Sequence, residues 1–298
     1  MPMKFLAYFG HMNIDITIGV GRIVTEGTTM ASTIRRQFGG TLGNFSIIAS
    51  KLGLNFHPYT VVSSRSHAAF INYLKSLGTD VSTIETVDTG EGPECYIISD
   101  RKEQAAYILQ GPMDSWNPSP AILKDTYEYM HFSTGPPIPY MGIASSSRSK
   151  ITFDPSQEIT YKYSPELVKA FTRKCNIIMG NRKEIGIILS ILGTSLEKRN
   201  TFDVIMTEGA TGATGYIGGR KYFVSSVKAE KIYDTVGAGD SFRAGFYTAL
   251  YRNLSMVDAI ISGNIVSSLA ISQPITQFNH TWKEIYEMIK EKREVMVH

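Results

Sequence analysis

Short runs of apolar residues alternate along the chain with longer amphipathic stretches. Uninterrupted apolar runs bounded by turn residues are typical of buried strands, and apolar positions recurring every three to four residues are typical of helices. The pattern predicts strands over residues 4–9, 55–62, 127–132, 150–153, 176–179, 204–206 and 222–227. It predicts a helix that opens within 38–44 and ends at Leu52, and helices over 66–77 and 281–295, from Ser164, from Ser241, and from Ser255 to Ile271. Strands that alternate with helices in this way predict an α/β fold, a mostly parallel sheet with helices on both faces.

Two segments break this alternation. Residues 14–38 contain short β-branched runs interrupted by Gly19, Gly21 and Gly27, and they predict two or three strands without a helix between them. Residues 91–110 contain apolar positions on either side of a polar turn at 100–103, which predicts a hairpin. Together the two segments predict a small separate sheet on one α/β domain that spans residues 1–298.

Composition and charge narrow the class of protein. The chain has 298 residues, 43% of them hydrophobic and 19% charged, which is ordinary for a globular protein with a sizeable core. The net charge of +3 is small and the Lys and Arg residues are spread out, so we expect no nucleic-acid partner. Cys95 and Cys175 lack the spacing of a metal or redox site, and the longest apolar run, 185–192, is too short to span a bilayer. Without a signal peptide, this favours a cytoplasmic protein with no membrane partner.

The stretch 234–246, D-T-V-G-A-G-D-S-F-R-A-G-F, carries the strongest chemical signal. Gly237, Ala238 and Gly239 offer little side-chain bulk, so successive backbone amides can turn toward one point. The helix that follows adds its dipole and its unpaired amides, and a glycine-lined turn at a helix start is an anion site. The stretch therefore predicts a phosphate-binding turn.

Asp240 does not fit as a phosphate ligand, because its carboxylate would repel one. Its place is explained if it accepts the proton of a hydroxyl that attacks the phosphate. The alternative is that Asp240 is an N-cap at an ordinary helix start.

Polar residues that follow strand ends supply further candidates. Asn13 and Asp15 are two apart, so in an extended chain they share one face and can bind neighbouring hydroxyls; read alone, they also fit a polar loop. Gly39 and Gly40 precede a helix and allow close approach to the backbone, and Asn44 offers both a donor and an acceptor.

A second set lies further along the chain. Asn181 and Glu184 are three apart at a helix start, where they fit either a capping pair or oxygen ligands for Mg²⁺. Thr207, Gly209 and Gly212 form a turn that lets backbone lie near a nucleotide. Asn264 lies on a later helix, where it either reaches the nucleotide base or is an ordinary surface residue.

In this order the motifs resemble those of the ribokinase-like (phosphofructokinase-B) family of sugar and nucleoside kinases, and the resemblance covers nearly the whole chain. It implies a three-layer ribokinase-like fold in which the small sheet is a lid. It implies ATP-dependent transfer of a phosphoryl group to a hydroxyl of a sugar or nucleoside, with Asp240 as the base and residues 237–239 as the anion hole. It assigns Asn13, Asp15, Gly39, Gly40 and Asn44 to the acceptor.

The same resemblance assigns Asn181, Glu184, Thr207, Gly209, Gly212 and Asn264 to the nucleotide. It also implies a Mg²⁺ ion held near Glu184 through water. In some members a monovalent cation is bound near the residue that corresponds to Asp234. A homodimer formed through the lid is a further expectation.

One departure from the family pattern concerns the acceptor. After Asp154 and Pro155, many family sugar kinases carry Asn-x-Arg, whereas this chain has Ser156, Gln157 and Glu158. A phosphorylated acceptor is therefore less favoured, although Arg22, Arg35, Arg36 and Arg101 in the lid segments can bind a phosphate. A regulator that binds nucleotide or sugar without turnover is the second alternative. For a nucleoside acceptor, Tyr96 and Tyr107 of the lid are candidates to face the base.

Overall fold

The computed structural model describes residues 3–298 except 89, 101 and 199–200. Its described residues form a nine-stranded sheet in the order β13-β12-β11-β10-β9-β8-β1-β4-β5. The pairings are parallel except for the two that β12 makes with β11 and β13. The strands are β1 (Lys4–Phe9), β4 (Phe56–Ser63), β5 (Ile84–Val87), β8 (Tyr127–Phe132), β9 (Lys150–Phe153), β10 (Ile177–Asn181), β11 (Asp203–Thr207), β12 (Gly212–Ile217) and β13 (Arg220–Ser225).

Side chains on the two faces of this sheet enter two separate hydrophobic cores. Along β1, Leu6 and Tyr8 belong to one core, while Ala7 and Phe9 belong to the other, as the period of two in a strand requires. The first core is covered by α1 (Thr41–Lys51), α2 (Ala68–Ser76), α6 (Ala238–Tyr251), α7 (Met256–Ala270) and α8 (Trp282–Met296). The second is covered by α3 (Pro137–Ser146), α4 (Pro165–Thr172) and α5 (Arg182–Leu192). The predicted mostly parallel sheet with helices on both faces is confirmed.

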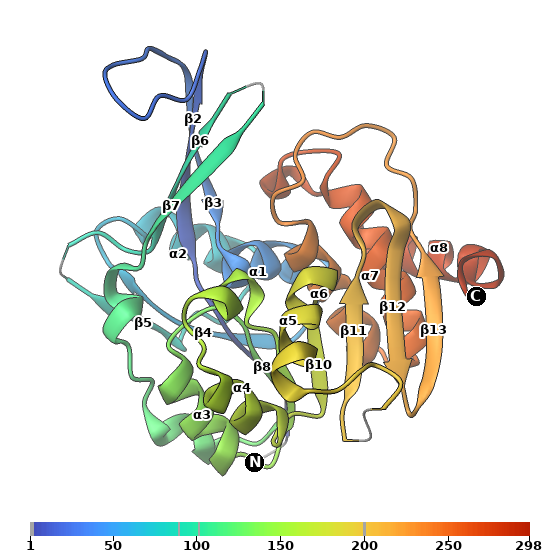
Figure 1. Ribbon diagram of the computed structural model, residues 1–298. Coiled ribbons are helices and arrows are strands. Elements are labelled where there is room, and N and C mark those ends of the chain that lie inside the picture. Colours follow the sequence, from blue (N-terminus) through green and yellow to red (C-terminus); the bar gives the residue numbers. More distant parts are fainter. Residues whose placement is uncertain (1–2, 89, 101, 199–200) are drawn as a thin grey trace.

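The small sheet is also confirmed. Its described residues form four strands in the order β3-β2-β6-β7, and Figure 1 shows them rising away from the body of the molecule. They are β2 (Asn13–Val20), β3 (Ala31–Gly39), β6 (Glu94–Ser99) and β7 (Gln104–Leu109). The first lid segment therefore contributes two strands, joined by an irregular stretch over residues 21–30.

Three elements went unpredicted. Strand β5 is only four residues long. Helix α3 begins with Pro137, and three prolines near its start masked it, although proline is tolerated in a first turn, where amides have no helical partner. Strand β12 contains Gly212 and Gly215, which disfavour a strand locally, but a Cβ at Gly215 would lie 2.5 Å from Ile260 of α7. The Ile260 side chain occupies the space that a side chain at residue 215 would take.

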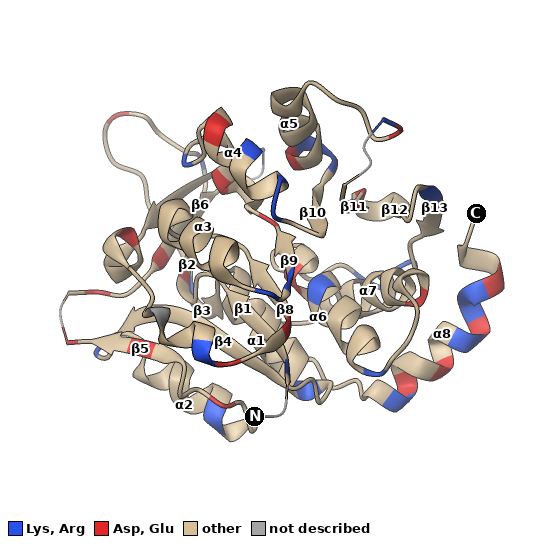
Figure 2. Ribbon diagram, turned by 90° about the horizontal axis from the view of Figure 1, so that it is seen from below, with Lys and Arg blue, Asp and Glu red and all other residues tan. Residues whose placement is uncertain are grey.

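Short 3₁₀ turns connect several of these elements: η1 (Gly111–Ser115), η2 (Pro120–Lys124), η3 (Ser156–Thr160), η4 (Gly209–Thr211) and η5 (Ile275–Gln277). Acidic and basic segments are interspersed along α8 at the outer edge (Figure 2). No helix among the described residues is long and apolar enough to cross a membrane.

Candidate active site

A cavity of about 580 Å³ lies where the carboxyl ends of β1, β8, β9, β10 and β11 meet the lid and the start of α6. Ligands bind at this edge of open α/β sheets, because the loops that leave the strands diverge there. Most of the predicted site residues line the cavity: Asn13, Asp15, Gly40, Asn44, Asn181, Glu184, Thr207, Gly209, Gly237, Ala238, Gly239 and Asp240. The fold therefore brings together segments from the whole length of the chain.

The predicted anion hole is a left-handed turn at the start of α6. Gly237 is the N-cap residue with φ of 80°, and the hydroxyl and amide of Ser241 both donate to its carbonyl oxygen at 2.9 Å. The amide of Ala238 donates to the Thr235 carbonyl at 3.2 Å, whereas the described residues accept no hydrogen bond from the amides of Gly237 and Gly239. Amides in a first helical turn have no partner within the helix, so this turn presents donors to the cavity.

Asp240 is the third residue of α6, and its side chain does not cap the helix. One carboxylate oxygen accepts from the Asn44 amide at 3.0 Å, and the other accepts from Arg243 at 3.1 Å. The side chain is 8% exposed, and burial raises its pKa to about 6 although Arg243 lowers it. The simple N-cap interpretation is therefore wrong, and the carboxylate lines the cavity with a pKa suited to accepting a proton near neutral pH.

Asn13 and Asp15 lie side by side on one face of β2. The Asn13 side-chain oxygen is buried without a hydrogen-bond partner, which is unusual unless a ligand supplies the donor. Burial, reinforced by the charge of Asp240, raises the pKa of Asp15 to about 7. Gly39 does not line the cavity, but a Cβ there would overlap the Asp15 carboxylate, so this glycine makes room for Asp15. Gly40, with φ of 84°, passes close to the His11 backbone and does line the cavity.

At the other end, Asn181 and Glu184 form a reciprocal capping box at the start of α5. The Glu184 amide donates to the Asn181 side chain at 2.9 Å, and the Asn181 amide donates to Glu184 Oε2 at 2.8 Å. Both side chains also line the cavity, so capping does not exclude a role toward a ligand. Burial, and then the charge of Asp154, raise the pKa of Glu184.

Several predictions need correction. Asn264 lies outside the cavity lining and is not a surface residue: its buried amide donates to the carbonyls of Val224 and Ser225 at 3.0 and 3.2 Å and so holds β13. Gly212 is also outside the lining and is paired with Ser225 at the start of β12. Tyr96 and Tyr107 are paired with each other across strands β6 and β7. They lie on the face of the lid that points away from the cavity, because Cys95, Ile97 and Ile108 on the other face line it.

Asp234 lies in a neighbouring cavity of about 380 Å³ that Arg35 and Arg36 also line, and it accepts the amide of Val236 at 2.9 Å. Arg22 lies outside both linings, and Arg101 lies outside the described residues. Among the described residues, no cluster of three His, Cys, Asp or Glu side chains forms a ready-made metal site.

Sequence reasoning missed a buried polar set around this cavity. Arg243 and Asp154 form a salt bridge next to Asp240. Glu158 accepts the amide of Gly135 and pairs with Lys162, each at 2.7 Å. The position of Asp154 directly after a strand, and of Arg243 three residues after Asp240, were available signals.

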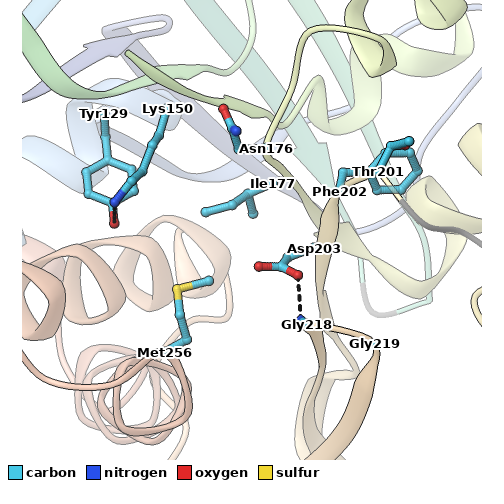
Figure 3. A pocket seen from close by; sticks show the side chains of 10 residues that line it. All are labelled: Tyr129, Lys150, Asn176, Ile177, Thr201, Phe202, Asp203, Gly218, Gly219 and Met256. Atoms are coloured by element: carbon cyan, nitrogen blue, oxygen red, sulfur yellow. Dashed lines mark hydrogen bonds between the residues drawn. The ribbon is translucent and has the colours of Figure 1, made fainter. Parts of the chain in front are cut away.

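A second cavity, of about 630 Å³, lies at the opposite edge of the sheet between the starts of β9, β10 and β11 and α7 (Figure 3). Its charged groups are occupied: Lys150 donates to Tyr129 and Glu128, and Asp203 accepts the Gly218 amide at 2.9 Å. It holds none of the predicted site residues. The candidate active site is therefore identified by the residues that line it and not by its volume.

Comparison with known proteins agrees with this geometry. The family model described as "pfkB family carbohydrate kinase" matches residues 3–283. A nucleoside kinase of Thermoplasma acidophilum is 40% identical over 283 residues, covering 95% of each chain. A crystal structure from the same organism has a TM-score of 0.89 at 38% identity and covers 99% of this chain and 100% of its own. The Methanocaldococcus jannaschii nucleoside kinase structure has a TM-score of 0.88 at 24% identity, covering 97% and 99% respectively, and shares the fold.

Proposed function

This chain belongs to the pfkB family of carbohydrate kinases, and on that premise we propose that it transfers the γ-phosphoryl group of ATP to a hydroxyl of a nucleoside. It is a small-molecule kinase that acts on a sugar or a nucleoside; the choice of a nucleoside and the roles of individual residues are the proposal. The observation that carries it is the Asp240 carboxylate beside the unpaired amides of Gly237 and Gly239 in one cavity.

In the proposed reaction, Asn13 and Asp15 hold hydroxyls of the acceptor, and Asp240 takes the proton of the attacking hydroxyl. The amides at the start of α6 stabilise the negative charge on the transferred phosphoryl group. The lid excludes water that would otherwise accept the phosphoryl group. Capping holds Asn181 and Glu184 rigidly at the end of the cavity that we assign to the nucleotide, with Thr207 and Gly209.

Glu184 fits Mg²⁺ bound mainly to phosphates and water, because its carboxylate lines the cavity and Mg²⁺ commonly takes only one or two protein carboxylates. Bound there, Mg²⁺ would neutralise phosphate charge.

Asp234 is the proposed ligand of a monovalent cation. A turnover rate that is the same in Na⁺, K⁺ and Tris buffers contradicts that assignment.

The charges around the acceptor favour a neutral nucleoside over a sugar phosphate. Glu158 stands where many family sugar kinases carry arginine, and its side chain is buried. Arg243, which lines the cavity, is paired with Asp154 and Asp240, and Lys162, which lies outside the lining, is paired with Glu158. A phosphorylated acceptor in this cavity would therefore meet carboxylates, because Arg35 and Arg36 line only the neighbouring cavity.

The test is ATP consumption over a panel of adenosine, inosine, cytidine, ribose and fructose 6-phosphate, with Mg²⁺ and with a chelator. We expect turnover with at least one nucleoside at a kcat/KM at least tenfold above that for ribose or fructose 6-phosphate, and none with the chelator. Preference for fructose 6-phosphate contradicts the nucleoside proposal. Nucleotide binding with no turnover on any acceptor supports the regulator alternative.

Replacing Asp15 by Asn should stabilise the protein at alkaline pH while weakening acceptor binding. The folded protein holds the Asp15 proton up to about pH 7, whereas the ordinary pKa is 3.8, so the free energy of unfolding falls as pH rises between these values. The Asn variant has no carboxyl group to ionise at this position. Its free energy of unfolding relative to that of the parent should therefore increase by about 3 kcal/mol between pH 5 and pH 8.

Urea unfolding at the two pH values measures this gain. Asp114→Asn, at an exposed position outside the cavity, is the control and should show no such gain. An Asp15→Asn variant whose stability relative to the parent is independent of pH contradicts the prediction.

We also propose that the lid forms a homodimer. Ile34 and Tyr107 are 63% and 62% exposed, and the register of the four strands places them on the same outward face. Sedimentation equilibrium tests this, and a monomer at assay concentrations contradicts it. A cytoplasmic location, where ATP is present and Cys95 and Cys175 stay reduced, remains part of the proposal.

A further inference from the structure

A buried arginine lies between two carboxylates at the floor of the active-site cavity. Arg243 donates from Nε and Nη2 to the two oxygens of Asp154, the Nη2–Oδ1 distance being 2.7 Å. Its Nη1 donates to Asp240 Oδ1 at 3.1 Å. Asp154 is 0% and Arg243 7% exposed. The proposed reaction uses Asp240 but gives neither of the other two residues a role.

The local structure explains why this arrangement is rigid. Asp154 directly follows β9, and its amide donates to the Phe132 carbonyl at 2.9 Å, so its backbone is tied to the neighbouring strand β8. Arg243 lies one helical turn after Asp240 on α6, which brings the two side chains to one face. Gly239 leaves space for the guanidinium, since a Cβ there would lie 2.8 Å from Nη1.

A guanidinium is planar, so fixing one edge fixes the direction of the other. Asp154 binds the edge formed by Nε and Nη2 in a bidentate manner, and the remaining nitrogen points to Asp240. Asn44 holds the second oxygen of Asp240 from α1. Asp240 is thus held from two sides, and one of the two supports depends on Asp154.

We propose that Arg243, held by Asp154, is a positioning residue for phosphoryl transfer: it orients the Asp240 carboxylate toward the acceptor and keeps it ionised. The inference rests on the proposed role of Asp240 as the base. It assigns Asp154 a supporting role with no contact to the acceptor.

The charges around Asp240 show why the guanidinium is needed. Among the described residues, the titratable groups that interact with Asp240 include Tyr8 on β1, Asp15 on β2, Asp154 after β9, Glu184 on α5 and Arg243 on its own helix, and the neutral Asn44 amide also donates to it. Three carboxyl groups thus oppose ionisation, and Arg243 is the single cation among these groups. Burial already raises the pKa of Asp240 to about 6, and Arg243 lowers it. Removing Arg243 therefore raises the pKa of Asp240.

The experiment compares pH profiles of kcat/KM between pH 5 and 9.5 for the parent, Arg243→Lys and the double variant Asp154→Asn/Arg243→Gln. The double variant removes both charges together, because Arg243→Gln alone would leave a buried, unpaired Asp154 and threaten folding. Arg293→Gln is the control. Arg293 also pairs with an aspartate, Asp258, at an Nε–Oδ1 distance of 3.2 Å, and both residues lie outside the cavity lining. Thermal melting verifies that each variant folds.

We expect the parent profile to rise through about pH 6, with a kcat of the double variant at pH 7 at least about tenfold lower. The midpoint of the double variant should move upward, because the lost effect of Arg243 on the pKa of Asp240 is larger than the lost opposing effect of Asp154. Activity of the double variant recovers partly at pH 9, where Asp240 ionises. Arg243→Lys keeps the charge and so the midpoint, but it loses activity because an ammonium cannot contact both carboxylates in this geometry. Arg293→Gln leaves the profile unchanged.

A double variant that folds and loses activity with an unchanged midpoint overturns the inference, because a purely structural role lowers activity without moving the profile. Full activity in the double variant also overturns it. The Asp240→Asn variant tests the proposed function separately from the role of Arg243. If that variant retains turnover, the proposed function has failed; if it is inactive while the double variant keeps the parent midpoint, only the role of Arg243 has failed.

Discussion

Replacing Asp240 by Asn lowers kcat by about 10²–10⁴-fold, the usual contribution of a general base, while nucleotide affinity stays within about threefold. The amide has nearly the same shape, but its single oxygen accepts from only one of the two donors, Asn44 or Arg243, and it cannot take a proton. The proposed nucleotide contacts of Asn181, Glu184 and Thr207 are unchanged. Steady-state kinetics with a nucleoside measure kcat, and calorimetry with ADP measures affinity.

Asp258→Asn is a close control for this variant. Asp258 is the third residue of α7 as Asp240 is of α6, and each is 8% exposed, but Asp258 lies outside the cavity. The same substitution there should leave kcat unchanged within about twofold. An Asp240→Asn variant that keeps more than a tenth of the parent kcat contradicts the assignment of the base.

Replacing Gly237 by Ala should lower kcat by about 10²–10³-fold, as expected when a donor to the developing negative charge is displaced. A Cβ at this position would lie 2.7 Å from Ile275 and 3.0 Å from the side-chain nitrogen of Asn44. Either the turn moves and its amides lose their direction, or Asn44 moves and releases Asp240. The left-handed φ of 80° adds about 1–2 kcal/mol of backbone strain for a residue with a Cβ.

Gly193→Ala is the control that separates the effect of backbone strain from the effect on catalysis. Gly193 ends α5 with φ of 62°, and a Cβ there would meet no atom within 4 Å. It should therefore show a similar loss of stability with full turnover. Melting curves and kcat measured on both variants make the comparison. Equal activity in the two variants contradicts the role of the Gly237 turn in catalysis.

Local sequence was enough to predict those parts of the site in which neighbouring residues act together. The turn from Gly237 to Gly239 needs small residues and positive φ, and the capping box of Asn181 and Glu184 needs a spacing of three. Asn13 and Asp15 share a strand face because strand period is two. The fold class followed from the alternation of apolar runs and amphipathic stretches, and the order of motifs indicated the family.

Other features depended on which segments meet in space. In the sequence, nothing indicates a partner for Asn264 on its helix. In the structure, β13 packs against α7, and two carbonyl oxygens of β13 accept hydrogen bonds from the Asn264 side-chain amide. Tyr96 and Tyr107 are lid aromatics in sequence, but the register of β2 against β6 puts Cys95 on the cavity side with Asp15 and turns the tyrosines outward. Arg243 donates hydrogen bonds to Asp154, which lies 89 residues earlier in the sequence.

The sequence by itself determined the glycine-lined turn at the start of α6, the carboxylate beside it and the strand–helix alternation, because each depends on backbone conformation or spacing within a few residues. Only the tertiary structure decided how that carboxylate is held and charged. Burial, the Asn44 amide and the guanidinium fixed by Asp154 come from separate segments, and the pKa of a buried group depends on everything packed around it.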